Sequence, residues 1–205
     1  MTLKRAGLAG IVVVAIGAGG IGLLAGRDAV DAPRTANAAE ATRQEAAPSG
    51  DLVEFVDEQA KFAISYPKAW VRAQSPNPQI PLIAAERDPA ENQGGSILVR
   101  VSPLEAAVAR EQLGEVRKVT DPIVAAGEGV ELKAEPAEIT QGGLPGLYYF
   151  YTFHDSVSGR RGAHAHYFLF QGQTMISLVF QALPEEDFIR LAPILDRVAA
   201  SFRVL

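Results

Sequence analysis

Three strand-like runs near the end of the chain constrain its fold more than any other feature. The runs are Leu147–His154, Ala163–Phe170 and Thr174–Gln181. Runs of this length, rich in aromatic and β-branched residues and bounded by turn residues, are typical of strands in an antiparallel meander. Because side chains alternate along a strand, Tyr149 and Tyr151 lie on one predicted face and Tyr148 and Phe150 on the other. Both faces are apolar, so we expect a sheet that is covered on both sides.

Two predicted helices supply that cover. Near the C-terminus, Phe188, Leu191, Leu195 and Val198 recur at helical spacing, with Pro184 expected at the start of the helix. A second helix is expected to open at Ser102-Pro103-Leu104-Glu105 and to bury the stripe Ala106, Ala109, Leu113 and Val116. The remaining strand candidates are 52–56, 61–66, 81–86, 96–101 and 130–139. We therefore predict an α+β domain, an antiparallel β-sheet flanked by helices on both faces.

The first fifty residues predict export. Lys4 and Arg5 precede an uncharged apolar run from Ala6 to Gly26, and a run of about twenty residues suffices to span a bilayer as a helix. Cations before the run favour a cytoplasmic N-terminus. We expect 1–26 to be a signal anchor or signal peptide, 27–50 a flexible Ala/Pro-rich tether and 51–205 a globular domain. The protein is expected in the cell membrane, single-pass with its C-terminal domain extracytoplasmic, or secreted or periplasmic after cleavage near Ala38.

Composition narrows the function classes. The net charge of −5 argues against a nucleic-acid partner, and the lack of cysteine excludes thiol chemistry and disulfides. The segment Gly17–Gly22 matches a dinucleotide-binding fingerprint, but an Ala/Pro-rich stretch stands where the second strand of that motif is needed. We therefore expect no nicotinamide cofactor.

Several motifs resemble a known family. Phe62-Ala63-Ile64-Ser65-Tyr66-Pro67-Lys68-Ala69-Trp70 is similar to the F-x-x-x-Y-P-x-x-W opening of PsbP-like domains. Gly159-Arg160-Arg161, Pro184-Glu185 and Ser201-Phe202 match features near the end of such domains. The family is similar to the extrinsic PsbP subunit of photosystem II and to LpqN-type envelope proteins. The resemblance implies an α/β/α sandwich over about 52–205 that binds proteins without catalysis; a link to photosynthesis is not implied.

The three histidines form the one candidate site in the sequence. His154, His164 and His166 all fall in a predicted hairpin around Asp155–Gly162. His164 and His166 share one face of their strand. His154, on the other strand of the hairpin, shares that face only in a register in which the numbers of two opposite residues add to an even total, for example with His154 opposite His164. In that register the imidazoles could bind zinc or another divalent ion. In the alternative, the histidines are polar residues near a strand end or packed against the aromatic face.

Little in the chain suggests catalysis. Ser156 and Ser158 lie near His154 and Asp155, but neighbours on one turn cannot readily form a nucleophile, a base and an orienting acid in line. We therefore expect no enzyme. The predicted function is a non-catalytic, extracytoplasmic binding or scaffold module of an envelope or membrane protein complex. The alternative is a small-ligand or divalent-metal carrier.

Overall fold

The computed structural model describes residues 50–87 and 93–205. The expected anchor at 1–26 and nearly all of the expected tether lie outside these residues. Within the described ranges, no helix has the length and apolar character needed to cross a membrane.

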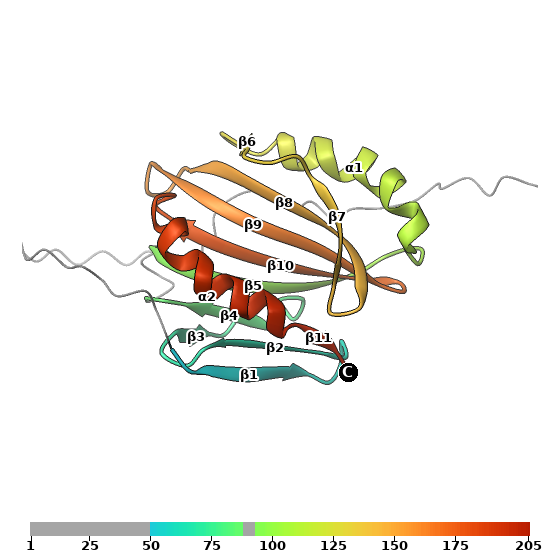
Figure 1. Ribbon diagram of the computed structural model, residues 1–205, viewed down its shortest axis with the longest axis horizontal. Coiled ribbons are helices and arrows are strands. Elements are labelled where there is room, and N and C mark those ends of the chain that lie inside the picture. The colour runs from blue at the N-terminus through green and yellow to red at the C-terminus, as the bar shows by residue number, and fades with distance from the viewer. Residues whose placement is uncertain (1–49, 88–92) are drawn as a thin grey trace, which may run out of the picture.

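The described residues form two antiparallel sheets (Figure 1). The strands are β1 Leu52–Asp57, β2 Phe62–Pro67, β3 Val71–Ala73, β4 Leu82–Ala85, β5 Gly94–Pro103, β6 Glu131–Leu132, β7 Ala137–Gln141, β8 Leu144–Asp155, β9 Arg160–Gln171, β10 Thr174–Leu183 and β11 Arg203–Val204. The main sheet has the order β3-β4-β5-β10-β9-β8-β6, with β7 also paired to β8. The small sheet has the order β1-β2-β11. Strands β10, β9 and β8 are consecutive neighbours in the main sheet, so the prediction of an antiparallel meander is confirmed.

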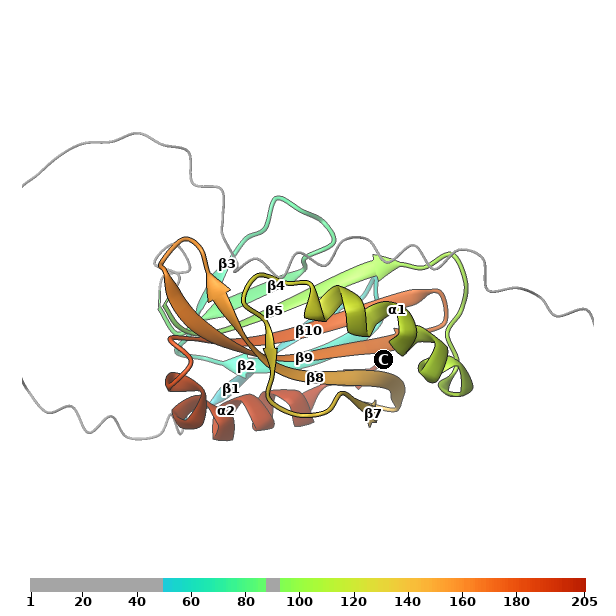
Figure 2. The ribbon, with the colours of Figure 1, turned by 90° about the horizontal axis from the view of Figure 1, so that it is seen from above.

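Two helices flank the main sheet. Helix α1 spans Leu113–Ala125 after a short 3-10 turn, and α2 spans Asp187–Ser201. In β9, Leu169 belongs to the core that contains α2, whereas its neighbour Phe168 belongs to the core that contains α1. Because consecutive strand residues point to opposite faces, the two helices cover opposite faces of the sheet. Figure 2 shows the same separation, and the predicted helical cover of both faces is confirmed.

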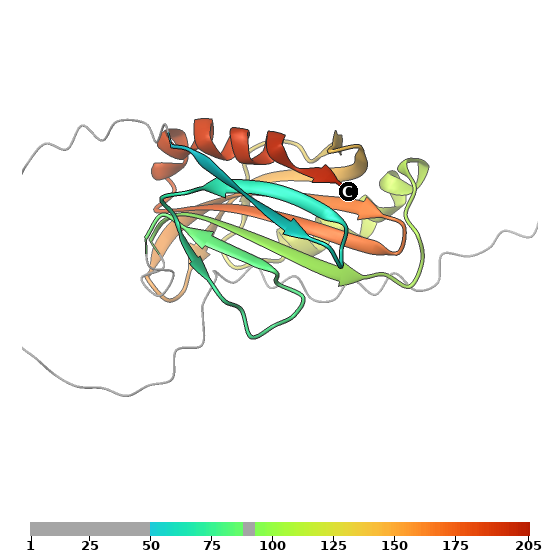
Figure 3. The ribbon, with the colours of Figure 1, turned by 90° about the horizontal axis from the view of Figure 1, so that it is seen from below.

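The small sheet adds to the core beneath α2. Phe62 and Ile64 of β2 are fully buried with Leu195 and Val198 of α2, and Phe62 stacks on Phe202, which follows the helix. Figure 3 shows β1 and β2 in front of the main sheet with α2 beside them. In the sequence motif that starts at Phe62, Phe62 and Trp70 are therefore core residues, and the partly buried Tyr66 packs against the same core.

Both predicted helix starts were wrong by several residues. Ser102 and Pro103 are the last residues of β5, and the segment that follows bonds to the β9–β10 turn, Leu104 N–H to Gln173 O and Val108 N–H to Gly172 O. These bonds replace the first helical turn, so the helix begins only at Leu113. Pro184 stands before α2 in a cis peptide bond with Leu183, and Asp187 is the first helical residue.

Candidate functional site

The register of the β8–β9 hairpin separates the histidines. Tyr149 pairs with His166, Tyr151 with His164, and His154 with Arg161, so paired residue numbers add to an odd total. His164 and His166 are buried on the α1 face, whereas His154 is exposed. The condition for a three-histidine metal site is therefore not met by this register. The described residues contain no group of three histidine, aspartate or glutamate side chains placed to hold a metal.

His164 and His166 belong to a buried hydrogen-bond chain. Nε2 of His164 lies 2.9 Å from Oε1 of Gln181, which can only accept, so this nitrogen donates. Nδ1 of His164 then accepts from the Tyr151 hydroxyl at 3.1 Å, and the same hydroxyl accepts from Nδ1 of His166 at 3.3 Å. These assignments satisfy each donor in the chain with a neutral imidazole. They leave Nε2 of His166 buried, and it has no partner among the described residues.

Burial keeps both imidazoles uncharged. Burial lowers the pKa of His164 to about 4, although the hydrogen bond to Gln181 raises it by a smaller amount. Burial also lowers the pKa of His166 to about 3, and the nearby His164 is a second cause of that lowering. Each ring also packs on an aromatic neighbour, His164 on Phe153 at 4.2 Å and His166 on Phe168 at 4.1 Å between centroids. Because both nitrogens of His164 are already used, the pair does not offer two free lone pairs to one ion. The arrangement is that of a packed polar layer in the core.

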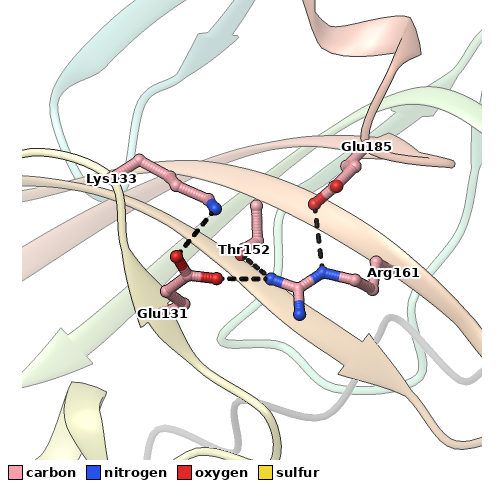
Figure 4. Close-up of polar contacts among 5 residues, drawn as sticks. All are labelled: Glu131, Lys133, Thr152, Arg161 and Glu185. Atoms are coloured by element: carbon pink, nitrogen blue, oxygen red, sulfur yellow. Dashed lines mark hydrogen bonds and ion pairs between the residues drawn. The ribbon is translucent and has the colours of Figure 1, made fainter.

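An exposed ion-pair network lies on the opposite face of the same hairpin (Figure 4). Arg161 donates from Nε to Glu185 at 3.3 Å, and from Nη2 to Glu131 at 2.9 Å and to Thr152 at 2.5 Å. Lys133 contacts the second oxygen of Glu131 at 3.1 Å. The glutamates raise the pKa of Arg161, with the Glu185 hydrogen bond as the largest cause. The hydrogen bonds of Arg161 to these residues use Nε and Nη2, and Nη1 makes none with the other four residues drawn in Figure 4.

This network joins three elements at one end of the domain. Glu131 lies in β6, Arg161 at the start of β9, and Glu185 two residues before the first residue of α2. The backbone N–H of Glu185 also donates to the carbonyl of Arg161 at 2.9 Å. One surface contains Arg161, Glu131, Glu185, the adjoining turn 156–159 and the first turn of α2. We call this surface the Arg161 end. In the sequence, Arg161 stands out only as part of the Gly159-Arg160-Arg161 motif, which by itself indicates no contact with Glu131 or Glu185.

Two exposed apolar side chains project from the Arg161 end. Val157 in the β8–β9 turn is 79% exposed and Ile189 in the first turn of α2 is 84% exposed, the highest values among the large hydrophobic residues of the described chain. Both segments lie at the same end of the molecule in Figures 1 and 2. Water contact with these side chains is unfavourable, at roughly 25 cal/mol per Å² of apolar surface. A partner that covered them would recover that free energy.

Both apolar side chains stand on braced backbone. In the turn, the buried carboxylate of Asp155 accepts from the N–H and the hydroxyl of Ser158, at 2.8 and 2.5 Å. Gly159 closes the turn with a positive φ of 70°, a conformation that glycine adopts without a Cβ clash. In α2, Arg190 binds Glu86 through two hydrogen bonds of 2.7 and 2.9 Å. A surface held in this way loses little conformational entropy when a partner binds.

Comparison with known proteins supports the fold. No protein-family model matches the chain, and no curated protein matches it in sequence. Among solved structures, LpqN of Mycobacterium tuberculosis, described as involved in cell envelope biogenesis, aligns with a TM-score of 0.57 at 12% identity over 75% of this chain and 91% of its own. The cyanobacterial PsbP of Synechocystis aligns at 0.49, with 15% identity over 75% of this chain and 92% of its own.

A protein from Bacteroides thetaiotaomicron aligns with a TM-score of 0.49 and 14% identity over 74% of this chain. This chain spans only 48% of that protein's length. At these identities the likeness concerns fold alone. The alignment with LpqN supports the LpqN-type, PsbP-like fold that the sequence motifs predicted.

Proposed function

We propose that this domain is a non-catalytic binding module of the cell envelope, and that it holds a membrane or envelope protein through its Arg161 end. The observation that carries the proposal is the pair of exposed apolar side chains, Val157 and Ile189, on braced backbone segments at the same end of the domain as the Arg161 network. Contiguous exposed apolar surface with a polar rim is typical of protein interaction sites.

The chemistry of the surface specifies the partner. Nη1 of Arg161 and the exposed side chain of Arg160 can donate to a carboxylate or to backbone carbonyls. Val157 and Ile189 need apolar surface opposite them. We therefore propose a protein partner that presents an acidic side chain flanked by two apolar depressions, an arrangement in which buried apolar contacts supply affinity and the charged contact fixes orientation.

The location in the envelope rests on the sequence. Lys4, Arg5 and the apolar run to Gly26 support a membrane anchor, with the domain on the extracytoplasmic side. Cleavage near Ala38 would instead leave a secreted or periplasmic protein with the same surface. The fold shared with LpqN, a protein described as involved in cell envelope biogenesis, is in keeping with this location.

Site-specific photo-cross-linking tests the proposal. A photoreactive amino acid is placed at position 157, at position 189, and at the control position Lys118, an exposed residue of α1. The cross-linking is done in intact cells that express the full chain. We expect one and the same envelope protein to be captured from positions 157 and 189 and not from position 118. Capture of unrelated proteins from the two positions, or equal capture from the control, contradicts the proposal.

A further inference from the structure

A pocket of about 390 Å³ lies at the other end of the domain. Its lining residues are Asp57, Gln59, Ala60, Pro78, Gln79, Val101, Pro103 and Thr174. Thr174 pairs with Pro103 at the β5–β10 end of the sheet, and the meander places that end opposite the β8–β9 turn. The β1–β2 turn of the small sheet forms the facing wall. Pockets between structural layers are common ligand sites, and the volume suits one small ring.

The walls of this pocket are braced by backbone contacts. Oδ1 of Asp57 accepts from the N–H groups of Gln59 and Ala60, both at 2.9 Å, which fixes the β1–β2 turn. On the other wall the carbonyl of Gln79 accepts from Val101 N–H at 2.8 Å, and its Oε1 accepts from Arg100 at 3.2 Å. The pocket is therefore formed before any ligand binds, which lowers the entropy cost of binding.

The polar groups that line the pocket define a ligand class. Oδ2 of Asp57 makes no hydrogen bond with the described residues and can accept from a ligand. The Nε2 amide group of Gln79, the carboxamide of Gln59 and the hydroxyl of Thr174 are likewise without a described side-chain partner, and together they both donate and accept. The Asp57 carboxylate is the only charged side chain among the described lining residues, so the lining disfavours an anionic ligand.

The apolar half of the lining narrows the class further. Ala60, Pro78, Val101 and Pro103 are apolar and balance the four polar residues. A pyranose ring has the same division, with an apolar C–H face and hydroxyl groups around its edge. We propose that this pocket binds an uncharged, hydroxyl-rich ligand of the size of one sugar ring, with Asp57 as the main acceptor. This proposal goes beyond the proposed protein-binding function and uses a different surface.

Saturation-transfer NMR on the full chain tests the proposal with glucose, galactose and N-acetylglucosamine as probes. The chain is kept in phosphocholine micelles, because maltoside detergents would compete as sugars. Glucose 6-phosphate serves as the anionic comparison. We expect saturation transfer to at least one neutral sugar, and a weaker signal for glucose 6-phosphate than for glucose.

Two conservative variants locate the binding. Asp57→Asn removes the charge but keeps an oxygen for the turn, and Thr174→Val removes the hydroxyl at nearly constant shape. Each is expected to weaken binding by up to about tenfold, because one hydrogen bond contributes roughly 0.5 to 1.5 kcal/mol and somewhat more when one partner is charged. The control Asp51→Asn changes an exposed carboxylate outside the pocket and should leave binding unchanged.

The proposal is overturned by the absence of transfer to any neutral sugar, by transfer that persists unchanged in both pocket variants, or by tighter binding of glucose 6-phosphate. Cross-linking from positions 157 and 189 does not depend on this pocket, so failure of the sugar experiment is distinguishable from failure of the proposed protein-binding function.

Discussion

Acid should destabilise this domain through its two buried histidines. In the folded protein, burial lowers the pKa of His164 to about 4 and of His166 to about 3, whereas both have an ordinary pKa of 6.5 when the chain is unfolded. Below that ordinary value the unfolded chain binds protons that the folded chain does not. The stabilising contribution is therefore present above about pH 6.5 and is progressively lost as the pH falls toward the folded-state pKa values.

The magnitude follows from these pKa values. Between about pH 7 and about pH 5, linkage gives a loss of about 2 kcal/mol in the free energy of unfolding for each histidine, and about 4 kcal/mol for the pair. This is a large part of the stability of an ordinary domain, roughly 5 to 15 kcal/mol. Urea titrations monitored by the fluorescence of Trp70 at a series of pH values measure the loss directly.

Variants separate this effect from general acid denaturation. His166→Phe keeps an aromatic ring against Phe168 and removes the unpartnered Nε2, so it should retain or raise stability near pH 7 and remove about half of the acid loss. The exposed His154→Gln is the matched control and should keep the full loss. An equal acid loss in the wild type and in His166→Phe would refute the reasoning, because the imidazole of His166 would then not control the pH dependence.

Three further changes test the packing around α1 and α2 by urea titration near neutral pH. Glu86→Gln replaces the charged acceptor of both hydrogen bonds from Arg190 and should cost about 1 to 2 kcal/mol; an unchanged midpoint contradicts a role for this pair. Gly95→Ala places a Cβ 2.9 Å from both methyl groups of the fully buried Leu191 and should cost about 1 to 3 kcal/mol, and a neutral result would mean that this side chain can move aside. Tyr149→Phe removes the buried hydroxyl that donates to Asp121 at 2.6 Å and should cost about 1 to 3 kcal/mol, whereas a stabilised variant would refute the value of that bond.

The strands and their covered faces could be predicted from the sequence because hydrophobic alternation is a local signal. The meander β8–β10 and the helical spacing of Leu191, Leu195 and Val198 in α2 are confirmed by the structure. The start of α1 could not be predicted in this way. Ser102 and Pro103 suit a helix cap, but the bonds of Leu104 and Val108 to the β9–β10 turn depend on tertiary structure, which local propensity does not contain.

The register of the histidine hairpin has a local signal in the sequence. A four-residue turn between Asp155 and Arg160 fixes the odd register, and the Asp155 carboxylate bonded to Ser158, followed by Gly159, is a recognisable turn pattern. The Arg161 end had no such signal. Its charged residues come from β6, β9 and the segment before α2, and only the fold places Glu131 and Glu185 on either side of Arg161.

The most direct test of the account is the effect of surface variants on the partner complex. The full chain is purified from mildly cross-linked membranes as the wild type, as Val157→Asp, as Ile189→Asp, and as the control Val71→Asp, which alters an exposed valine of β3. We predict that a single stoichiometric envelope protein accompanies the wild type and the control, and that both variants of the Arg161 end lose it while keeping their urea midpoints. Retention of that protein by Val157→Asp and Ile189→Asp would contradict the claim that the domain binds its partner through this end.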